Sequence, residues 1–261
     1  MTKMNQKQIE KEWIKIIKAE EKFISHNLHK KEAGWQQKIE KYVPEKLSQN
    51  LNAAFGKAFE MIFEKGTGLI EKTYNKEKRE KEHQINAYAA ETMGSRKTLK
   101  AFGKQAKASK NVNTLLSAVE GIGMGLAGAG LPDIPVFLTV LLRSIYEIAT
   151  IYGFEYTDEQ EQIFILKVIE TALMHEYPLQ ESNAGLNAWI KEPKAFDVSK
   201  EEQIKRTSLA LSNEMLYLKF VQGAPVIGVV GGVSDMVYQK KITDYAEMKY
   251  KRRFLASKRV W

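Results

Sequence analysis

Two glycine-rich apolar segments constrain the fold of this chain more than any other feature. The first, at residues 121–135, reads GIGMGLAGAGLPDIP, and the second, at residues 223–232, reads GAPVIGVVGG. Glycine inside a helix costs up to about 1 kcal/mol relative to alanine, so such runs need a compensating gain, and close backbone packing is one. We expect the two segments to lie side by side at the centre of the fold. The predicted close-packing glycines are Gly121, Gly123, Gly125, Gly128, Gly130, Gly223, Gly228, Gly231 and Gly232.

The first glycine segment has two other interpretations. Residues 121–142 carry a single charge, Asp133, and are long enough to cross a bilayer. Pro132 and Pro135 fall mid-way, however, where one helix would end and another begin, which favours a buried helical hairpin over a re-entrant membrane hairpin. Gly123, Gly125 and Gly128 also match the dinucleotide-binding fingerprint G-x-G-x-x-G. That motif follows a strand, whereas the residues before Gly121 are predicted to be helical, so we reject this interpretation.

The rest of the chain has the periodicity of helices. Apolar residues recur at spacings of three and four, and no segment alternates at period two between turn signals. The pattern predicts an all-α bundle of about eight or more helices, with the glycine-rich hairpin buried inside it. The expected helices cover residues 5–29, a segment from Pro44 to Phe63, 111–129, 134–152, 158–176, 199–222 and 226–256.

Local signals place several helix ends. Thr157 with Gln160, and Ser199 with Glu202, match the capping box. Gly153 suits a helix C-terminus, because glycine enters the left-handed region without a Cβ penalty. His175 precedes Pro178, so we expect it near a helix end, with a bend or break in the last helix near residue 240.

The net charge of +8 is unevenly distributed. Residues 1–110 hold 24 Lys and Arg against 14 Asp and Glu, residues 111–239 hold 8 against 16, and residues 240–261 hold 8 against 2. This layout predicts basic N-terminal helices (1–110) packed on a glycine-rich core with a basic C-terminal helix (111–261). It also suggests an anionic partner, although a helical surface rich in Lys and Glu can simply be solvated.

Two basic stretches are candidates for that contact. Basic helices with aromatic anchors can lie on anionic membranes, and the same charges can bind phosphates of nucleic acid. No nucleic-acid-binding module fits the layout, so we rank a membrane surface above nucleic acid. The candidate membrane-surface residues are Lys97, Lys100, Lys104, Lys107, Lys251, Arg252 and Arg253.

A set of polar residues follows the first glycine segment, namely Asp133, Arg143, Glu147, Tyr152 and Glu161. Arg143 and Glu147 lie four apart on an otherwise apolar helix, so they can form a buried pair on one turn. The set has two interpretations: a site for an anionic ligand or for proton transfer, or a structural network that locks three helices together.

Composition and motifs narrow the classes of function. The chain has no cysteine, which excludes disulfides and thiolate metal sites and fits a reducing compartment. His26, His29 and Glu32 have a spacing that a metal site can use, but without further ligand context we predict no metal and no cofactor. No nucleophile elbow or phosphate loop occurs, and the N-terminus lacks the apolar run of a signal peptide.

In combination, several short motifs resemble those of the EcsC family, over roughly residues 45–257. They are GLPDIP (130–135), Leu142-Arg143, Tyr146–Ala149, Tyr152-Gly153, Glu161–Leu166, Ala224–Gly228, Asp244–Ala246 and Arg253–Leu255. The resemblance implies a bacterial intracellular protein associated, through gene neighbourhood, with an ATP-binding-cassette transporter. It implies no particular reaction.

The expected function is therefore non-enzymatic: a cytoplasmic accessory protein on the inner membrane surface, partnered by anionic lipid or a membrane transporter. Two alternatives stay open. One is a hydrolase-like enzyme that uses the carboxylates of Asp133, Glu147 and Glu161. The other is a carrier whose glycine helices line a cavity for a lipid or another apolar ligand.

Overall fold

The computed structural model describes residues 6–28, 45–71, 74–93, 101, 133–221 and 233–259. Throughout these residues every regular element is a helix and no strand occurs, so the predicted all-α fold class is confirmed. The N-terminal part contains α1 (Gln6–Leu28), α3 (Glu45–Met61), the π-helical turn η1 (Ile62–Gly66), α4 (Thr67–Glu71) and α5 (Lys76–Met93). The C-terminal part contains α8 (Asp133–Ile151), α9 (Glu159–Leu173), α10 (Glu176–Lys191), α11 (Lys200–Val221) and α12 (Val233–Lys258).

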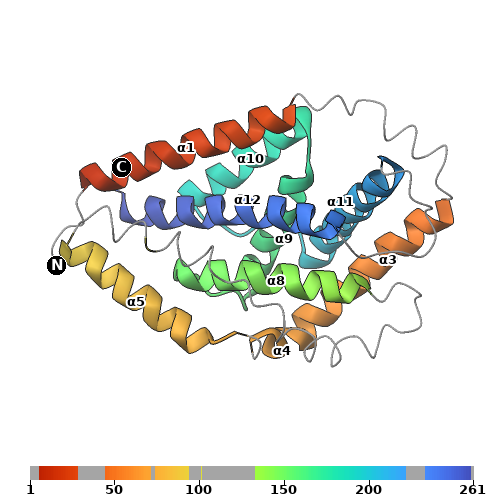
Figure 1. Ribbon diagram of the computed structural model, residues 1–261, viewed down its shortest axis with the longest axis horizontal. Helices are drawn as coiled ribbons and strands as arrows, with labels where there is room; N and C mark the ends of the chain where they lie inside the picture. The colour runs from red at the N-terminus through yellow and green to blue at the C-terminus, as the bar shows by residue number, and fades with distance from the viewer. Residues whose placement is uncertain are drawn as a thin grey trace.

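Helix α12 lies at the centre of the bundle. It packs against α1, α8, α9 and α10, and in Figure 1 it runs between α1 above and α8 below. The side-chain amide of Gln6 donates to the carbonyl of Lys258 at 3.4 Å, so the start of α1 lies beside the end of α12 and the two helices are antiparallel. Residues from opposite ends of the chain therefore share one interface.

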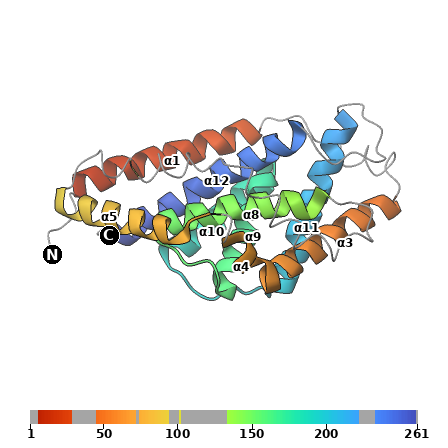
Figure 2. The ribbon, with the colours of Figure 1, turned by 60° about the horizontal axis from the view of Figure 1, so that its bottom comes forward.

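The other helices cover the sides of this centre. Helix α11 packs against both α3 and α9, and α5 packs against α8 at the edge of the bundle (Figures 1 and 2). The apolar side chains of these helices form one continuous core, in which Phe55, Ile145 and Tyr245 are fully buried. Burial of these apolar faces drives the packing of the amphipathic helices.

Helix α8 is apolar around most of its circumference. Its residues Ile134–Ile151 form the one described helix that is long and apolar enough to cross a bilayer, and 83% of that window is buried inside the protein. The core helix of a soluble protein passes the same length and composition test.

Most of the predicted helix positions agree with the structure, and two differences have physical causes. The helix predicted at 158–176 ends at Leu173, and a separate helix, α10, begins at Glu176. Pro178 lies in the first turn of α10, where a missing N–H removes no helical hydrogen bond, so it does not mark a helix end. The break predicted near residue 240 is absent, because α12 continues through Val233–Lys258 without an internal Gly or Pro.

Most of the predicted helix caps agree with the structure. The side chain of Ser199 accepts a hydrogen bond from the backbone N–H of Glu202 at 3.2 Å, as the capping box predicts. At α9, however, Asp158 rather than Thr157 accepts from the N–H of Glu161, at 3.0 Å. Gly153 follows α8 with a φ of +79°, and an added Cβ there would lie 2.3 Å from the ring of His83. Both its conformation and its packing therefore require glycine.

All nine predicted close-packing glycines and the predicted helix at 111–129 lie outside the described residues, as do Lys97, Lys100, Lys104 and Lys107. Of the first glycine segment, only residues 133–135 are described, as the start of α8. The expected packing of these glycines and the expected contacts of these lysines stay predictions.

Candidate functional site

A first polar network joins α8 to α5. The carboxylate of Glu147 lies 3.1 Å from Nε of Arg143, one turn earlier on α8, and 3.3 Å from a guanidinium nitrogen of Arg79 on α5. Its side chain is only 2% exposed. Burial raises the pKa of Glu147, although both arginines act in the opposite direction. The predicted Arg143–Glu147 pair therefore exists, and Arg79 is a third member that the sequence did not indicate.

Beside this network lies a group of buried tyrosines. The hydroxyl of Tyr156 donates to the carboxylate of Glu71 at 2.7 Å and also contacts the hydroxyl of Tyr74. The ring of Tyr146 stacks on that of Tyr156, with centroids 4.2 Å apart. Burial raises the pKa of all three tyrosines, so they stay protonated near neutral pH.

The π-helical turn contributes to the position of Glu71. The turn, Ile62–Gly66, leads directly into α4, and the hydroxyl of Thr67 donates to the carbonyl of Ile62 at 3.2 Å. Such turns shift the register of the helix that follows and often occur near functional sites. Glu71, the last residue of α4, is also 3.0 Å from Nζ of Lys76.

A second network joins α9 to α12. The guanidinium of Arg253 lies 2.8 and 2.6 Å from the two oxygens of Glu161, and the hydroxyl of Tyr250 donates to Glu161 at 2.7 Å. Arg253 also lies over three aromatic rings, at 4.2 to 4.9 Å from their centroids: those of Phe154, Phe164 and Trp189. Burial raises the pKa of Glu161 even though Arg253 favours its charged form.

A third network joins α1, α10 and α12. Lys249 on α12 is fully buried, and its ammonium donates to Glu20 of α1 at 3.1 Å and to Asn183 and Asn187 of α10 at 2.5 and 2.8 Å. Glu20 also accepts from Arg252 at 2.7 Å. Burial lowers the pKa of Lys249 to about 8, because the attraction of Glu20 only partly offsets the loss of hydration.

The structure divides the polar residues that the sequence grouped together. Arg143 and Glu147 belong to the first network, and Glu161 belongs to the second, with Arg253 as its partner. Tyr152 is 2% exposed and packs against the ring of Phe254. Asp133 is the first residue of α8, and its side chain lies outside the described atoms. The predicted residues therefore do not form one shared site in the part of the protein that is described.

The three basic residues predicted near the end of α12 are already engaged. Lys251 pairs with Glu12 at 2.8 Å, Arg252 with Glu20 and Arg253 with Glu161, and their side chains are 22%, 15% and 17% exposed. These contacts give them a structural role in holding α12 to α1 and α9. Their contact with a membrane stays a prediction.

His175 lies at a helix end, as predicted, and its side chain also contacts a carboxylate of another helix. It lies between α9 and α10, and its Nε2 is 2.6 Å from a carboxylate oxygen of Glu214 on α11. The carbonyl of Glu214 in turn accepts a hydrogen bond from the hydroxyl of Tyr238 at 2.7 Å. Glu214 of α11 thus contacts both His175 and Tyr238 of α12.

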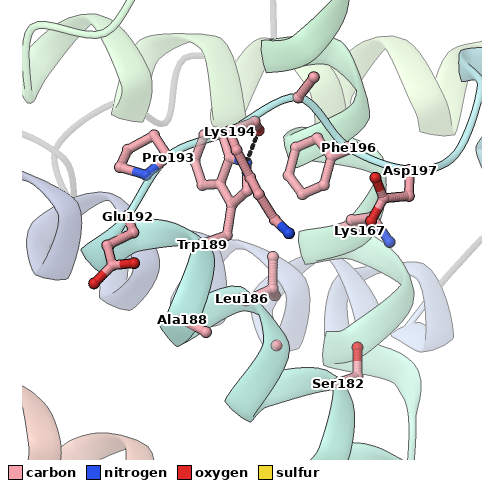
Figure 3. Close-up of a pocket in the computed structure, with 12 residues that line it drawn as sticks. Lys167, Ser182, Leu186, Ala188, Trp189, Glu192, Pro193, Lys194, Phe196 and Asp197 are labelled. Carbon is pink, nitrogen blue, oxygen red and sulfur yellow. Dashed lines mark hydrogen bonds between the residues drawn. The ribbon is translucent and has the colours of Figure 1, made fainter.

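A cleft lies apart from these networks, between α9, α10 and the connection from Glu192 to Asp197 (Figure 3). Its volume is about 610 Å³, and its lining residues include Lys167, Trp189 and Phe196. None of the carboxylates of the three networks lines it. Glu147 and Glu161, two of the three carboxylates of the hydrolase alternative, instead pair with arginines, and that alternative stays a prediction.

Sequence reasoning missed Tyr74, Tyr156, Glu20 and Lys249, and the reason is distance along the chain. Tyr74 and Tyr156 are 82 residues apart, and Glu20 and Lys249 are 229 apart. A polar residue at an apolar helix position is the one signal that was present. Glu12 and Glu20 are of this kind, since they lie on the face of α1 that holds Trp13 and Ile16.

Comparison of this chain with known proteins identifies one matching protein family. The model of the EcsC protein family matches residues 7–255. "Protein EcsC" of Bacillus subtilis (strain 168) is 26% identical over 143 residues, which cover 54% of this chain and 58% of that protein. "Uncharacterized protein YdbA" of the same organism is 25% identical over 152 residues, covering 55% and 53%. The chain thus spans little more than half the length of these relatives, and no solved structure matches it.

Proposed function

This chain belongs to the EcsC protein family, and we propose that it is a non-enzymatic accessory protein that binds anionic membrane surfaces through the outer face of α1. The observation that carries the proposal is a row of exposed lysines on that face, which we call the α1 lysine ridge. It consists of Lys7, Lys11, Lys15, Lys18 and Lys22.

The ridge follows from the spacing of the lysines. Successive residues of a helix are rotated by about 100°, so these five positions fall within an arc of about 80° and extend over roughly 22 Å. The buried residues Ile9, Trp13 and Ile16 lie on the opposite side of the helix. No acidic residue falls within the arc, and in two views α1 lies at the edge of the molecule (Figures 1 and 2).

The ridge has the chemistry of a membrane-surface helix. A lysine near an anionic bilayer contributes about 1 kcal/mol, so several together support reversible binding that weakens in salt. Lys15 contributes less, because it also pairs with Glu12. Ile14 is 45% exposed beside the lysines and offers an apolar side chain to the interface.

The ion pairs below α1 support the same role. Glu12 and Glu20 bind the basic end of α12, so these two acidic residues of α1 face inward, whereas the lysines of the ridge are exposed. This separation leaves a positive outer face on a helix that is fixed to the rest of the bundle. The transporter partnership and the cytoplasmic location implied by the family resemblance stay predictions.

The test is flotation of the purified protein with vesicles of phosphatidylcholine alone, or of phosphatidylcholine with phosphatidylglycerol, at low and high salt. We expect binding to the anionic vesicles at low salt only. The triple variant Lys11→Glu/Lys18→Glu/Lys22→Glu should lose it.

The matched control is Lys57→Glu/Lys65→Glu/Lys205→Glu. It changes the net charge equally at exposed lysines of α3, η1 and α11. We expect this control to float as the wild type does. Equal loss in both triple variants would mean diffuse attraction rather than a ridge, and no flotation of the wild type would refute membrane binding itself.

A further inference from the structure

The cleft beside α10 has a rigid aromatic wall. Trp189 stacks between Phe164, at a centroid distance of 5.0 Å, and Phe196, at 4.8 Å with the rings 11° from parallel. Two hydrogen bonds hold the connection that carries Phe196: Trp189 Nε1 donates to the carbonyl of Lys194 at 2.6 Å, and the N–H of Phe196 donates to Gln160 at 2.8 Å. The wall is therefore formed before any ligand arrives.

Lys167 of α9 is one of two lysines that line this cleft. It is half-buried, and its Nζ lies 5.4 Å from the centroid of Phe196 (Figure 3). No carboxylate forms an ion pair with it in the part of the chain that the structure describes, in contrast to the buried cations Lys249 and Arg253. Burial lowers the pKa of Lys167; Glu170 attracts its charge from a distance and Arg206 repels it.

An anion beside Lys167 would replace the hydration that the ammonium has lost. The number of charges on that anion is limited by the rest of the lining. Lys194 adds one positive charge, and Glu192 and Asp197 add two negative ones, so the lining side chains sum to zero. These carboxylates would repel a multiply charged anion such as a nucleotide more strongly than a single negative charge paired with Lys167.

The apolar residues of the lining indicate that the part of the ligand beyond its anionic group is apolar. Phe196 is the more exposed apolar ring of the lining, and Leu186 and Trp189, which are 3% and 9% exposed, add apolar edges beside it. A volume of about 610 Å³ lies in the range of small-molecule sites. We propose that this cleft binds a small monoanionic amphiphile, whose anionic group pairs with Lys167 and whose apolar body lies against Trp189 and Phe196. This site is separate from the α1 lysine ridge and does not rest on membrane binding.

Two fluorescent probes with the same aromatic rings test the proposal: 1-anilinonaphthalene-8-sulfonate, which carries one negative charge, and neutral N-phenyl-1-naphthylamine. Each is titrated into wild type, Lys167→Met, Phe196→Ala and the control Lys205→Met, which removes an exposed lysine of α11. We expect Lys167→Met to weaken binding of the sulfonate about tenfold or more. Its affinity for the neutral probe should change less than about twofold, and Phe196→Ala should weaken both.

A second measurement on the wild-type protein locates the probe. Acetylation of individual lysines is followed by mass spectrometry with and without the sulfonate. Protection of Lys167, with Lys205 unchanged, is the expected result. Equal sulfonate affinity of wild type and Lys167→Met, or acetylation of Lys167 that the sulfonate does not slow, would overturn the proposal. The triple variant of the α1 lysine ridge should bind both probes normally.

Discussion

The interface of α1 with α12 and the interface of α3 with α11 both join long helices, but different side chains fill them. Between α1 and α12 the buried polar residues are charged: Glu12, Glu20 and Lys249 are 2%, 3% and 0% exposed. Between α3 and α11 they are small. Ser208 of α11 faces Gly56 of α3, where an added Cβ would meet its hydroxyl oxygen at 3.8 Å.

The difference lies in how each polar group is satisfied. On α11 the hydroxyl of Thr207 donates to the carbonyl of Leu166 on α9, and that of Ser212 donates to the carbonyl of Leu209 on α11 itself. The hydroxyl of Ser208, which faces α3, has no hydrogen-bond partner among the described residues. On α1 and α12 the charges are satisfied by polar side chains of other helices: Lys249 binds Glu20, Asn183 and Asn187, and Glu20 also binds Arg252. The α1–α12 interface is therefore specific and sensitive to charge state, whereas the α3–α11 interface depends on shape.

The largest effect is expected at Glu20. Glu20→Ala should lower the free energy of unfolding by about 3–5 kcal/mol, because it leaves the buried Lys249 without its carboxylate. Urea denaturation followed by circular dichroism measures this. The control Glu21→Ala, at an exposed position of the same helix, should change stability by less than about 0.5 kcal/mol. Similar losses in both would remove the distinction between the two interfaces.

A double variant sharpens the same comparison. Glu20→Leu/Lys249→Met replaces the buried pair with apolar side chains, so its stability should return to within about 1–2 kcal/mol of wild type. Arg252 keeps its contact with the ring of Trp13, at 4.8 Å. A double-mutant cycle in urea measures the coupling, and losses that simply add would show that the pair is not coupled.

At the α3–α11 interface, bulk rather than charge should matter. Ser208→Leu should cost about 1–3 kcal/mol by overpacking against α3, with no dependence on salt. Thermal unfolding at low and high salt is the measurement, with Lys205→Leu as the control on the exposed face of α11. A strong salt dependence of the Ser208→Leu effect would argue against packing as its cause.

The smallest expected effect is a pH dependence that only the α1–α12 interface should have. Burial lowers the pKa of Lys249 from 10.5 to about 8. Between these two pKa values the unfolded chain binds a proton that the folded protein does not, so the free energy of unfolding rises with pH in this range. Below pH 8 both states are protonated, and the full penalty for burying the charged lysine lowers stability. Relative to Lys249→Met, the wild type should gain about 1–2 kcal/mol between pH 7.5 and 9.5. Urea denaturation at each pH tests this, and parallel curves for the two proteins would contradict it.

The local sequence pattern was sufficient to predict the positions of several helices. The helices α1, α8 and α11 begin and end within about two residues of their predicted limits, because apolar periodicity and Ser or Asp caps are short-range signals. Helix α10 was missed for an equally local reason: Pro178 looks the same at the end of one helix and in the first turn of the next.

The candidate site was predicted only in part. The pair Arg143–Glu147 was found, because a spacing of four residues on one helix brings side chains together wherever the helix lies. Glu161 and Arg253 were both singled out, but for unrelated roles, since nothing in their spacing shows that α9 and α12 are neighbours.

The sequence by itself determined the helical class, the apolar faces, the lysine spacing on α1 and the family, since all of these reside in the order of residues along the chain. The tertiary structure alone decided which charges are neutralised. Lys249, Arg252 and Arg253 bind buried carboxylates, whereas Lys11, Lys18 and Lys22 of α1 are exposed at the surface. The physical reason is that a charge is stabilised by whatever lies within a few ångströms of it, and packing brings together residues that are hundreds of positions apart.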